Sequence, residues 1–244
     1  LGAFFFAFQI YGDFSGYSDI AIGVSRLFGF NLKRNFAFPY FSRDIAEFWR
    51  RWHISLSTWF RDYLYIPLGG SRGGTKMKIR NTFIIFVVSG FWHGANWTFI
   101  IWGALNALYF LPLLLTNKNR INTDLVAEGK FLPSLKELWQ MAFTFFITLI
   151  AWVFFRADNV THAFSYLQST FTSSLFSWVE IFPTTILILV LFFILIEWLG
   201  RSNEYAIENV DVLKKPIRWS FYVLLIVLMF AFTGEEQQFI YFQF

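Results

Sequence analysis

Two histidines stand in surroundings where an ionisable side chain is unusual. His93 lies inside the apolar run 83–115, and His53 lies between a tryptophan and an isoleucine forty residues earlier. The run is long enough to cross a bilayer, and an ionisable group in hydrocarbon is costly enough to suggest a function. A neutral imidazole shielded from water suits general-base activation of a hydroxyl group.

The neighbours of His93 favour chemistry over a purely structural role, in which it would bond a nearby carbonyl or amide and stabilise a turn. Glycines on both sides of His93 leave room for a substrate, an amide side chain lies close by in the sequence, and two tryptophans flank the site. These neighbours are Gly90, Gly94, Asn96, Trp92 and Trp97. We expect Trp92 and Asn96 to contact substrate. The same run holds no acidic residue for a Ser-His-Asp triad, so the acceptor must supply the nucleophile and the donor must already be activated. Acyl transfer from a thioester to an alcohol meets both requirements.

The composition indicates a membrane protein. Of 244 residues, 56% are hydrophobic and only 15% are charged, and the mean hydropathy is +0.49. Soluble domains carry about 25% charged residues. The 35 Phe and 11 Trp suit lipid contact and interfacial belts. There is no cysteine, which excludes disulfides, thiolate metal sites and cysteine nucleophiles. No histidine pair has zinc-ligand spacing, so we expect no metal site. We also expect no nucleic-acid partner.

Apolar runs predict an all-α integral membrane protein that crosses the bilayer several times. A first helix ends near Tyr11, and four later runs are candidate crossings: 83–115, 138–155, 184–199 and 217–233. Because the chain opens within an apolar helical pattern, we interpret residues 1–244 as one transmembrane domain that lacks its N-terminal part.

The distribution of charge predicts the orientation. Residues 26–80 hold 11 of the 20 Lys and Arg residues against three acids, which places this block in the cytoplasm. Arg156 is the only cation in the loop after 138–155, so that loop should lie outside, and the basic loop 201–218 should lie inside. The run 83–115 must then begin and end on the cytoplasmic side. It is therefore predicted to be a hairpin or a re-entrant pair, with His93 near its turn or buried at depth.

The block 12–80 is predicted to be a cytoplasmic interfacial or re-entrant element. Apolar side chains recur at helical spacing between Ile45 and Phe60, and the opposite face carries Arg43, Glu47, Arg50 and Ser57. This pattern indicates a helix in the interface with its aromatic face among lipid headgroups. Arg50, Arg51 and Arg61 are also candidates to bind the phosphates of a cytoplasmic ligand, although membrane anchoring explains them almost as well.

Two glycine-rich segments have a structural interpretation. The segment 69–76 lacks the Gly-Lys-Ser/Thr order of a phosphate loop and is predicted to be a turn. The set Gly12, Gly16 and Gly23 is interpreted as small residues that allow close helix packing.

Four motifs together carry a family resemblance. They are 11–23 (YGDFSGYSDIAIG), 48–57 (FWRRWHISLS), 59–70 (WFRDYLYIPLGG) and 90–94 (GFWHG). They resemble the membrane-bound O-acyltransferase (MBOAT) superfamily, and most of all its bacterial branch that contains the alginate O-acetyltransferase membrane subunit. The strong matches cover about residues 9–110. The ending 239–244 is also similar to chain ends in that branch, which suggests an intact C-terminus.

The resemblance implies a function and a fold. The catalytic histidine of the superfamily matches His93, and a second important histidine matches His53, which would orient the donor or pass the acyl group along. The fold would be a bundle of many helices with a tunnel and cytoplasmic re-entrant elements. In the bacterial cytoplasmic membrane, acetyl groups from acetyl-CoA or another acyl thioester would reach an extracytoplasmic polysaccharide with help from periplasmic partner proteins.

We therefore expect an O-acetyltransferase that modifies a cell-envelope polysaccharide. Transfer of D-alanine from a carrier-protein thioester to teichoic acid is the alternative within the same fold. A transporter that uses His93 in a proton or solute pathway is the alternative from another class, and a structural interaction subunit is a third. Release of CoA from acetyl-CoA would separate an enzyme from a transporter.

Overall fold

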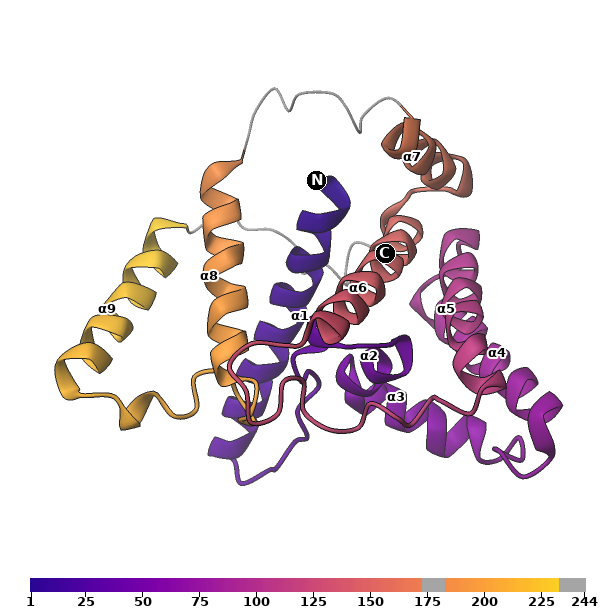
Figure 1. The fold of residues 1–244 in the computed structure, drawn as a ribbon, viewed down its shortest axis with the longest axis horizontal. Coiled ribbons are helices and arrows are strands. Elements are labelled where there is room, and N and C mark those ends of the chain that lie inside the picture. Colours follow the sequence, from indigo (N-terminus) through magenta and orange to yellow (C-terminus); the bar gives the residue numbers. More distant parts are fainter. Residues whose placement is uncertain (173–182, 233–244) are drawn as a thin grey trace. The chain divides into compact units, whose positions relative to one another are not determined.

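The computed structural model describes residues 1–172 and 183–232, and it contains helices and no strands in those ranges (Figure 1). The chain forms two compact units that divide between residues 180 and 181. The first unit contains α1 (Gly2–Leu27), α2 (Ile45–Arg51), α3 (Ile54–Phe60), α4 (Gly74–His93), α5 (Trp97–Leu115), α6 (Leu135–Arg156) and α7 (Val160–Thr172). It also contains a 3-10 turn, η1 (Pro39–Phe41), and a π-helical turn, η2 (Arg61–Tyr65). The second unit contains α8 (Thr184–Gly200), η4 (Val210–Val212) and α9 (Lys215–Ala231).

The helix α1 is longer than its composition predicts. It continues past Tyr11 to Leu27, so the first part of the block 12–80 is helical. Each interior glycine costs a helix only about 1 kcal/mol. Aromatic contacts such as Phe14 on Phe36, with ring centroids 5.0 Å apart, offset that cost. The helix ends where Gly29 adopts a φ of +82°.

Glycines mediate close helix packing between α4 and α5, whereas Gly12, Gly16 and Gly23 of α1 do not. A Cβ built at Gly12, Gly16 or Gly23 would meet no other described residue within 4 Å, so the interpretation of these glycines as packing residues is wrong for the described chain. A Cβ at Gly90 would instead collide with the carbonyl oxygen of Phe99. One at Gly103 would collide with that of Phe86. These pairings require α4 and α5 to run antiparallel with their backbones in contact.

The apolar run 83–115 is divided by a turn at 94–96, and His93 is the last residue of α4. By length and composition, α5 and α6 could each cross a membrane, and α8 is apolar but shorter. The predicted crossings 138–155 and 184–199 fall within α6 and α8. The predicted crossing 217–233 follows α9 to Ala231. Residue 233 and the ending 239–244 lie outside the described residues.

The region predicted as one interfacial helix consists of two seven-residue helices, α2 and α3. The break lies at Trp52 and His53, where His53 adopts a left-handed backbone with φ of 45°. Phe48 and Trp52 are 1% and 2% exposed, so this part of the aromatic face packs on the protein and not on headgroups, whereas Trp59 on α3 is 52% exposed. Glu47, expected to face water, is 1% exposed. A helical period identifies an apolar face, but it does not identify the surface that covers it.

Candidate active site

His93 lies in an aromatic cage built by three helices. Its ring centroid is 5.0 Å from Trp92 on α4, 5.2 Å from Trp102 on α5 and 5.0 Å from Phe155 on α6. Phe99 lies 6.2 Å away. Trp102 and Phe155 are buried, whereas Trp92 is 56% exposed. The half-buried imidazole is therefore shielded on the side of Trp102 and Phe155, and the exposed indole of Trp92 contacts its edge.

The turn that carries His93 is fixed by Asn96. Its side-chain oxygen accepts a hydrogen bond from the Thr98 N–H and caps α5, at 3.1 Å. Its Nδ2 donates to the Asp158 carbonyl oxygen at 2.9 Å, which ties the turn to the segment after α6. Asn96, predicted as a substrate contact, thus positions the tip of the hairpin. Substrate contact by Asn96 stays a prediction.

His53 begins α3 with its ring edge on Phe14, at a centroid distance of 4.7 Å. Its backbone is held by Asn35, whose carbonyl oxygen accepts from the Ile54 N–H at 2.9 Å. Removal of the ring from water lowers the pKa of His53 to about 4, so the imidazole is neutral at pH 7. Its Nδ1 is buried and has no hydrogen-bond partner among the described residues. The arrangement leaves a neutral, unengaged ring nitrogen.

An aromatic layer joins the surroundings of the two histidines. Trp152 of α6 contacts Trp52, the neighbour of His53, at 5.1 Å. It also contacts Trp102 at 6.1 Å and Phe155 at 5.2 Å, and both of these rings touch His93. The two histidines are close enough for a charge on one to act on the other. The structure therefore brings together the two histidines that the sequence singled out.

Trp152 was missed by the sequence analysis. It is 2% exposed, and its buried Nε1 has no hydrogen-bond partner in the described part of the chain. A buried indole N–H usually has a partner, so an unpaired one is notable. Within an apolar run of a chain with 11 tryptophans, no local signal distinguishes this residue.

The three arginines predicted to hold donor phosphates engage groups of the protein itself. Arg50 donates to the carbonyl oxygens of Asn119 and Asn122, at 2.9 and 2.7 Å. Arg51 pairs with the buried carboxylate of Glu47. Arg61 pairs with its neighbour Asp62 at 2.7 Å, and this ion pair is exposed. No described contact joins these three guanidinium groups to the histidines, so their role toward a donor stays a prediction.

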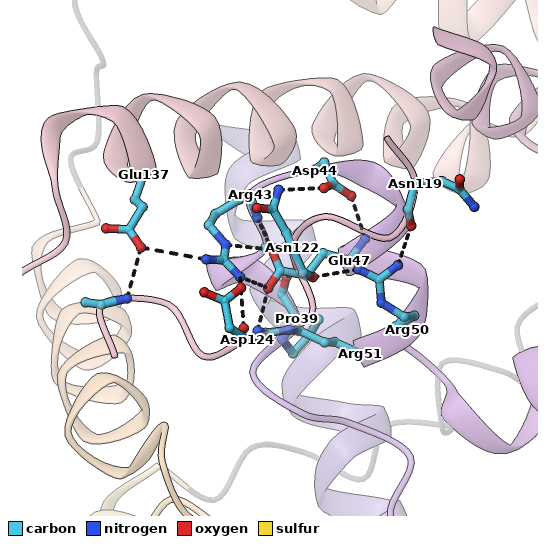
Figure 2. A network of polar contacts seen from close by, with 12 residues as sticks. Pro39, Arg43, Asp44, Glu47, Arg50, Arg51, Asn119, Asn122, Asp124 and Glu137 are labelled. Carbon is cyan, nitrogen blue, oxygen red and sulfur yellow. Dashed lines mark hydrogen bonds and ion pairs between the residues drawn. The ribbon is translucent and has the colours of Figure 1, made fainter. Parts of the chain in front are cut away.

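A polar network that the sequence analysis did not foresee positions α2 (Figure 2). We call it the clamp, and its members are Arg43, Asp44, Glu47, Arg50, Arg51, Asn119, Asn122, Asp124 and Glu137. At its centre, the Arg43 guanidinium donates to both carboxylate oxygens of Glu47, at 3.1 and 3.0 Å. It also donates to the carbonyl oxygen and the carboxylate of Asp124, at 2.8 and 2.9 Å, and the hydrogen bond to the carboxylate lowers the pKa of Asp124.

The clamp binds the loop between α5 and α6 to α2. Asn122 donates to Asp44 at 2.7 Å, and Asp44 caps α2 by accepting from the Glu47 N–H at 2.7 Å. The spacing of Arg43 and Glu47, four residues apart, is a signal for an ion pair. It does not reveal burial, because surface helices show the same spacing. The clamp fixes α2, and with it Trp49, which donates to Asn106 of α5 at 3.2 Å.

Comparison with known proteins identifies the family of this chain and several relatives. The family described as MBOAT, membrane-bound O-acyltransferase family, matches residues 2–157. The chain is 47% identical over 172 residues to a protein of Azotobacter vinelandii named probable alginate O-acetylase AlgI, which covers 70% of this chain and 32% of the relative. It is 43% identical over 163 residues to a peptidoglycan O-acetyltransferase of Helicobacter pylori, covering 67% and 29%. A teichoic acid D-alanyltransferase of Streptococcus thermophilus is 40% identical over 153 residues, covering 59% and 36%. The chain thus spans about a third of the length of these relatives.

Proposed function

Because the chain belongs to the membrane-bound O-acyltransferase family, we propose that it is the part of an O-acetyltransferase that carries the reacting groups. The enzyme would move an acetyl group from a cytoplasmic thioester to a hydroxyl group of an extracytoplasmic polysaccharide. The aromatic cage around His93 carries this proposal, because it shields one imidazole from water in a membrane protein. The relatives named as O-acetylating enzymes support the acetyl group.

His93 acts as the general base. It accepts the proton of an acceptor hydroxyl while the oxygen attacks the carbonyl carbon of the thioester. The new C–O bond forms, the C–S bond breaks, and the departing thiolate takes up the proton. His53 is neutral and its buried Nδ1 has no partner among the described residues, and we assign it the role of orienting the donor.

The proposed topology places the chain in the bacterial cytoplasmic membrane as a multi-pass protein. The basic block 26–80 faces the cytoplasm as a re-entrant element, where acetyl-CoA approaches. Arg61 and the outer edges of Arg50 and Arg51 are the proposed contacts to its phosphates. The acceptor lies on the other side of the membrane, and the acetyl groups reach it with the help of periplasmic partner proteins.

D-alanyl transfer to teichoic acid is the second candidate. The relative named as a D-alanyltransferase supports it. The chemistry at His93 would be the same, because a thioester again donates to a hydroxyl. The two candidates differ in the acyl group and in the acceptor.

The test is His93→Ala in the full-length protein, expressed in a strain without its own copy. We expect ester-linked acetate on the envelope polysaccharide to fall to the level of the empty strain, with an unchanged amount of protein in the membrane. The exposed Gln168→Ala on α7 is the control and should retain acetate. Unchanged acetate in His93→Ala would make His93 a packing residue. Ester-linked alanine in place of acetate would favour the second candidate.

A further inference from the structure

Phe155 is the central wall of the aromatic cage around His93. The side chain is 1% exposed, and its ring centroid lies 5.0 Å from that of the imidazole. The same ring contacts the two buried walls that α5 provides, with centroid distances of 5.1 Å to Phe99 and 5.2 Å to Trp102. Phe155 therefore joins the walls from α5 to α6 and closes the cage on the α6 side.

Further contacts hold these walls in place. The ring of Trp152, which is buried, contacts Phe155 at a centroid distance of 5.2 Å. Phe99 lies directly against α4, because a Cβ at Gly90 would collide with its carbonyl oxygen and one at Gly94 would lie 2.7 Å from its ring. Close-packed side chains of this kind do not move aside without strain. The space next to the imidazole is therefore set by the size of the wall residues.

The chemistry of the proposed reaction brings the acyl group to these walls. A general base lies within about 3 Å of the hydroxyl oxygen, which attacks a carbonyl carbon about 3–3.5 Å away. The carbonyl carbon must therefore come close to His93. Its sulfur substituent leads back to the donor and its oxygen develops negative charge, so the alkyl group is the substituent that gains from apolar burial. We expect the alkyl group to face Phe155, and the polar substituents to face the side of the exposed Trp92.

We propose that Phe155 determines the length of the acyl group that the enzyme transfers. Its ring fills the space that the alkyl chain of a longer acyl group would need, so a methyl group fits beside His93 and a propyl group does not. The proposal rests on the proposed function, and it narrows the donor to thioesters of short acyl groups. Acetyl and D-alanyl groups are both short, so the proposal applies to either candidate.

The test compares acetyl-CoA, propionyl-CoA and butyryl-CoA as donors. They are added to inverted membrane vesicles from cells that contain the full-length protein and the envelope polysaccharide, and the ester-linked acyl groups are released with alkali and quantified by mass spectrometry. The parent protein should transfer acetyl best and butyryl least. Phe155→Ala should raise the ratio of butyryl to acetyl transfer about tenfold or more, because each extra methylene gains from burial in the space that is opened. Phe155→Leu removes less volume and should raise propionyl transfer more than butyryl transfer.

Phe154→Ala is the matched control. Phe154 precedes Phe155 on α6 and is also buried, at 3% exposure, but its ring contacts Phe164 of α7 at a centroid distance of 5.4 Å. The two substitutions remove the same side chain from buried positions that face different neighbours, so both should destabilise the protein. Phe154→Ala should nevertheless keep the order of donors that the parent protein shows.

An unchanged order of donors in Phe155→Ala and Phe155→Leu would overturn the proposal. An equal shift in Phe154→Ala would also overturn it, because it would show a general loosening of α6. If Phe155→Ala does not accumulate in the membrane, the ratio measured for Phe155→Leu decides the question. The absence of transfer from every donor by the parent protein would be a different result, because it would refute the proposed function itself.

Discussion

Arg43, just before α2, and Glu47, in its first turn, form a buried ion pair with 3.0 Å between Nη2 and Oε1. Arg51 reaches the same carboxylate from the next turn, and Asp124 reaches the same guanidinium from the loop between α5 and α6. Burial of charged groups is costly unless every group is paired. The ion pair therefore links the position of α2 to the position of the loop between α5 and α6.

Arg43→Ala should destabilise the protein by about 3 kcal/mol or more, because it leaves the carboxylate of Glu47 buried without its main partner. The measurement is the free energy of unfolding in an SDS titration of the detergent-solubilised protein. Arg61→Ala is the matched control, because Arg61 and Asp62 form an exposed pair whose contribution to stability should be much smaller. Similar losses for the two variants would contradict the burial of the clamp.

The stability of the protein should fall between pH 6.5 and pH 4 because of His53. The pKa of this imidazole is about 4 in the folded protein, below the value of about 6.5 expected when the chain is unfolded. Between these values the unfolded chain binds more protons, so the contribution of neutral His53 is complete above pH 6.5 and declines as the pH falls. In His53→Leu this part of the pH dependence should disappear from the unfolding free energy. The same slope in parent and variant would show that His53 is not desolvated.

Gly103→Ala should separate α4 from α5. The added methyl group collides with the carbonyl oxygen of Phe86, and overpacking of this kind costs about 1–3 kcal/mol. Because His93 lies at the tip of the hairpin, acetyl transfer should fall together with the melting temperature. The control is Gly23→Ala, where the Cβ meets open space and the helix gains up to about 1 kcal/mol. A fully active Gly103→Ala protein would show that the close backbone contact is dispensable.

Arg50→Ala should release the loop 116–134. Its guanidinium donates to two carbonyl oxygens of that loop, and a single ammonium group cannot reproduce this forked geometry. Trypsin should cleave after Lys118 and Lys130 several-fold faster in Arg50→Ala than in the parent, with Arg50→Lys between them. An unchanged cleavage rate, combined with a raised KM for the thioester, would indicate that Arg50 contacts the donor and does not hold the loop.

The sequence predicted the features that depend on local properties. The apolar stretch 138–155 lies within α6, and 184–199 lies within α8, because length and apolarity are carried by each segment alone. His93 and His53 were singled out because an ionisable residue is unusual in such surroundings. Their approach across Trp152 could not be predicted, since it depends on how α2 and α6 pack.

Features that depend on a partner surface were mispredicted. The glycines and aspartates after Tyr11 resemble a loop, yet α1 continues to Leu27 because tertiary contacts outweigh weak helix propensity. The polar face of the helix predicts that Glu47 is exposed to water. Only the position of the loop between α5 and α6 shows that this face is covered.

The helix α6 connects two sites that have no direct contact. Glu137 in its first turn belongs to the clamp, and Phe155 in its last turn leans on the imidazole of His93, eighteen residues or roughly 27 Å away. An α-helix is stiff over that length, so a small tilt at one end displaces the other. A displacement of the loop 116–134 is therefore expected to move the aromatic cage around His93 as well. We therefore expect the clamp to influence the position of Phe155 and, through it, of His93, the proposed general base.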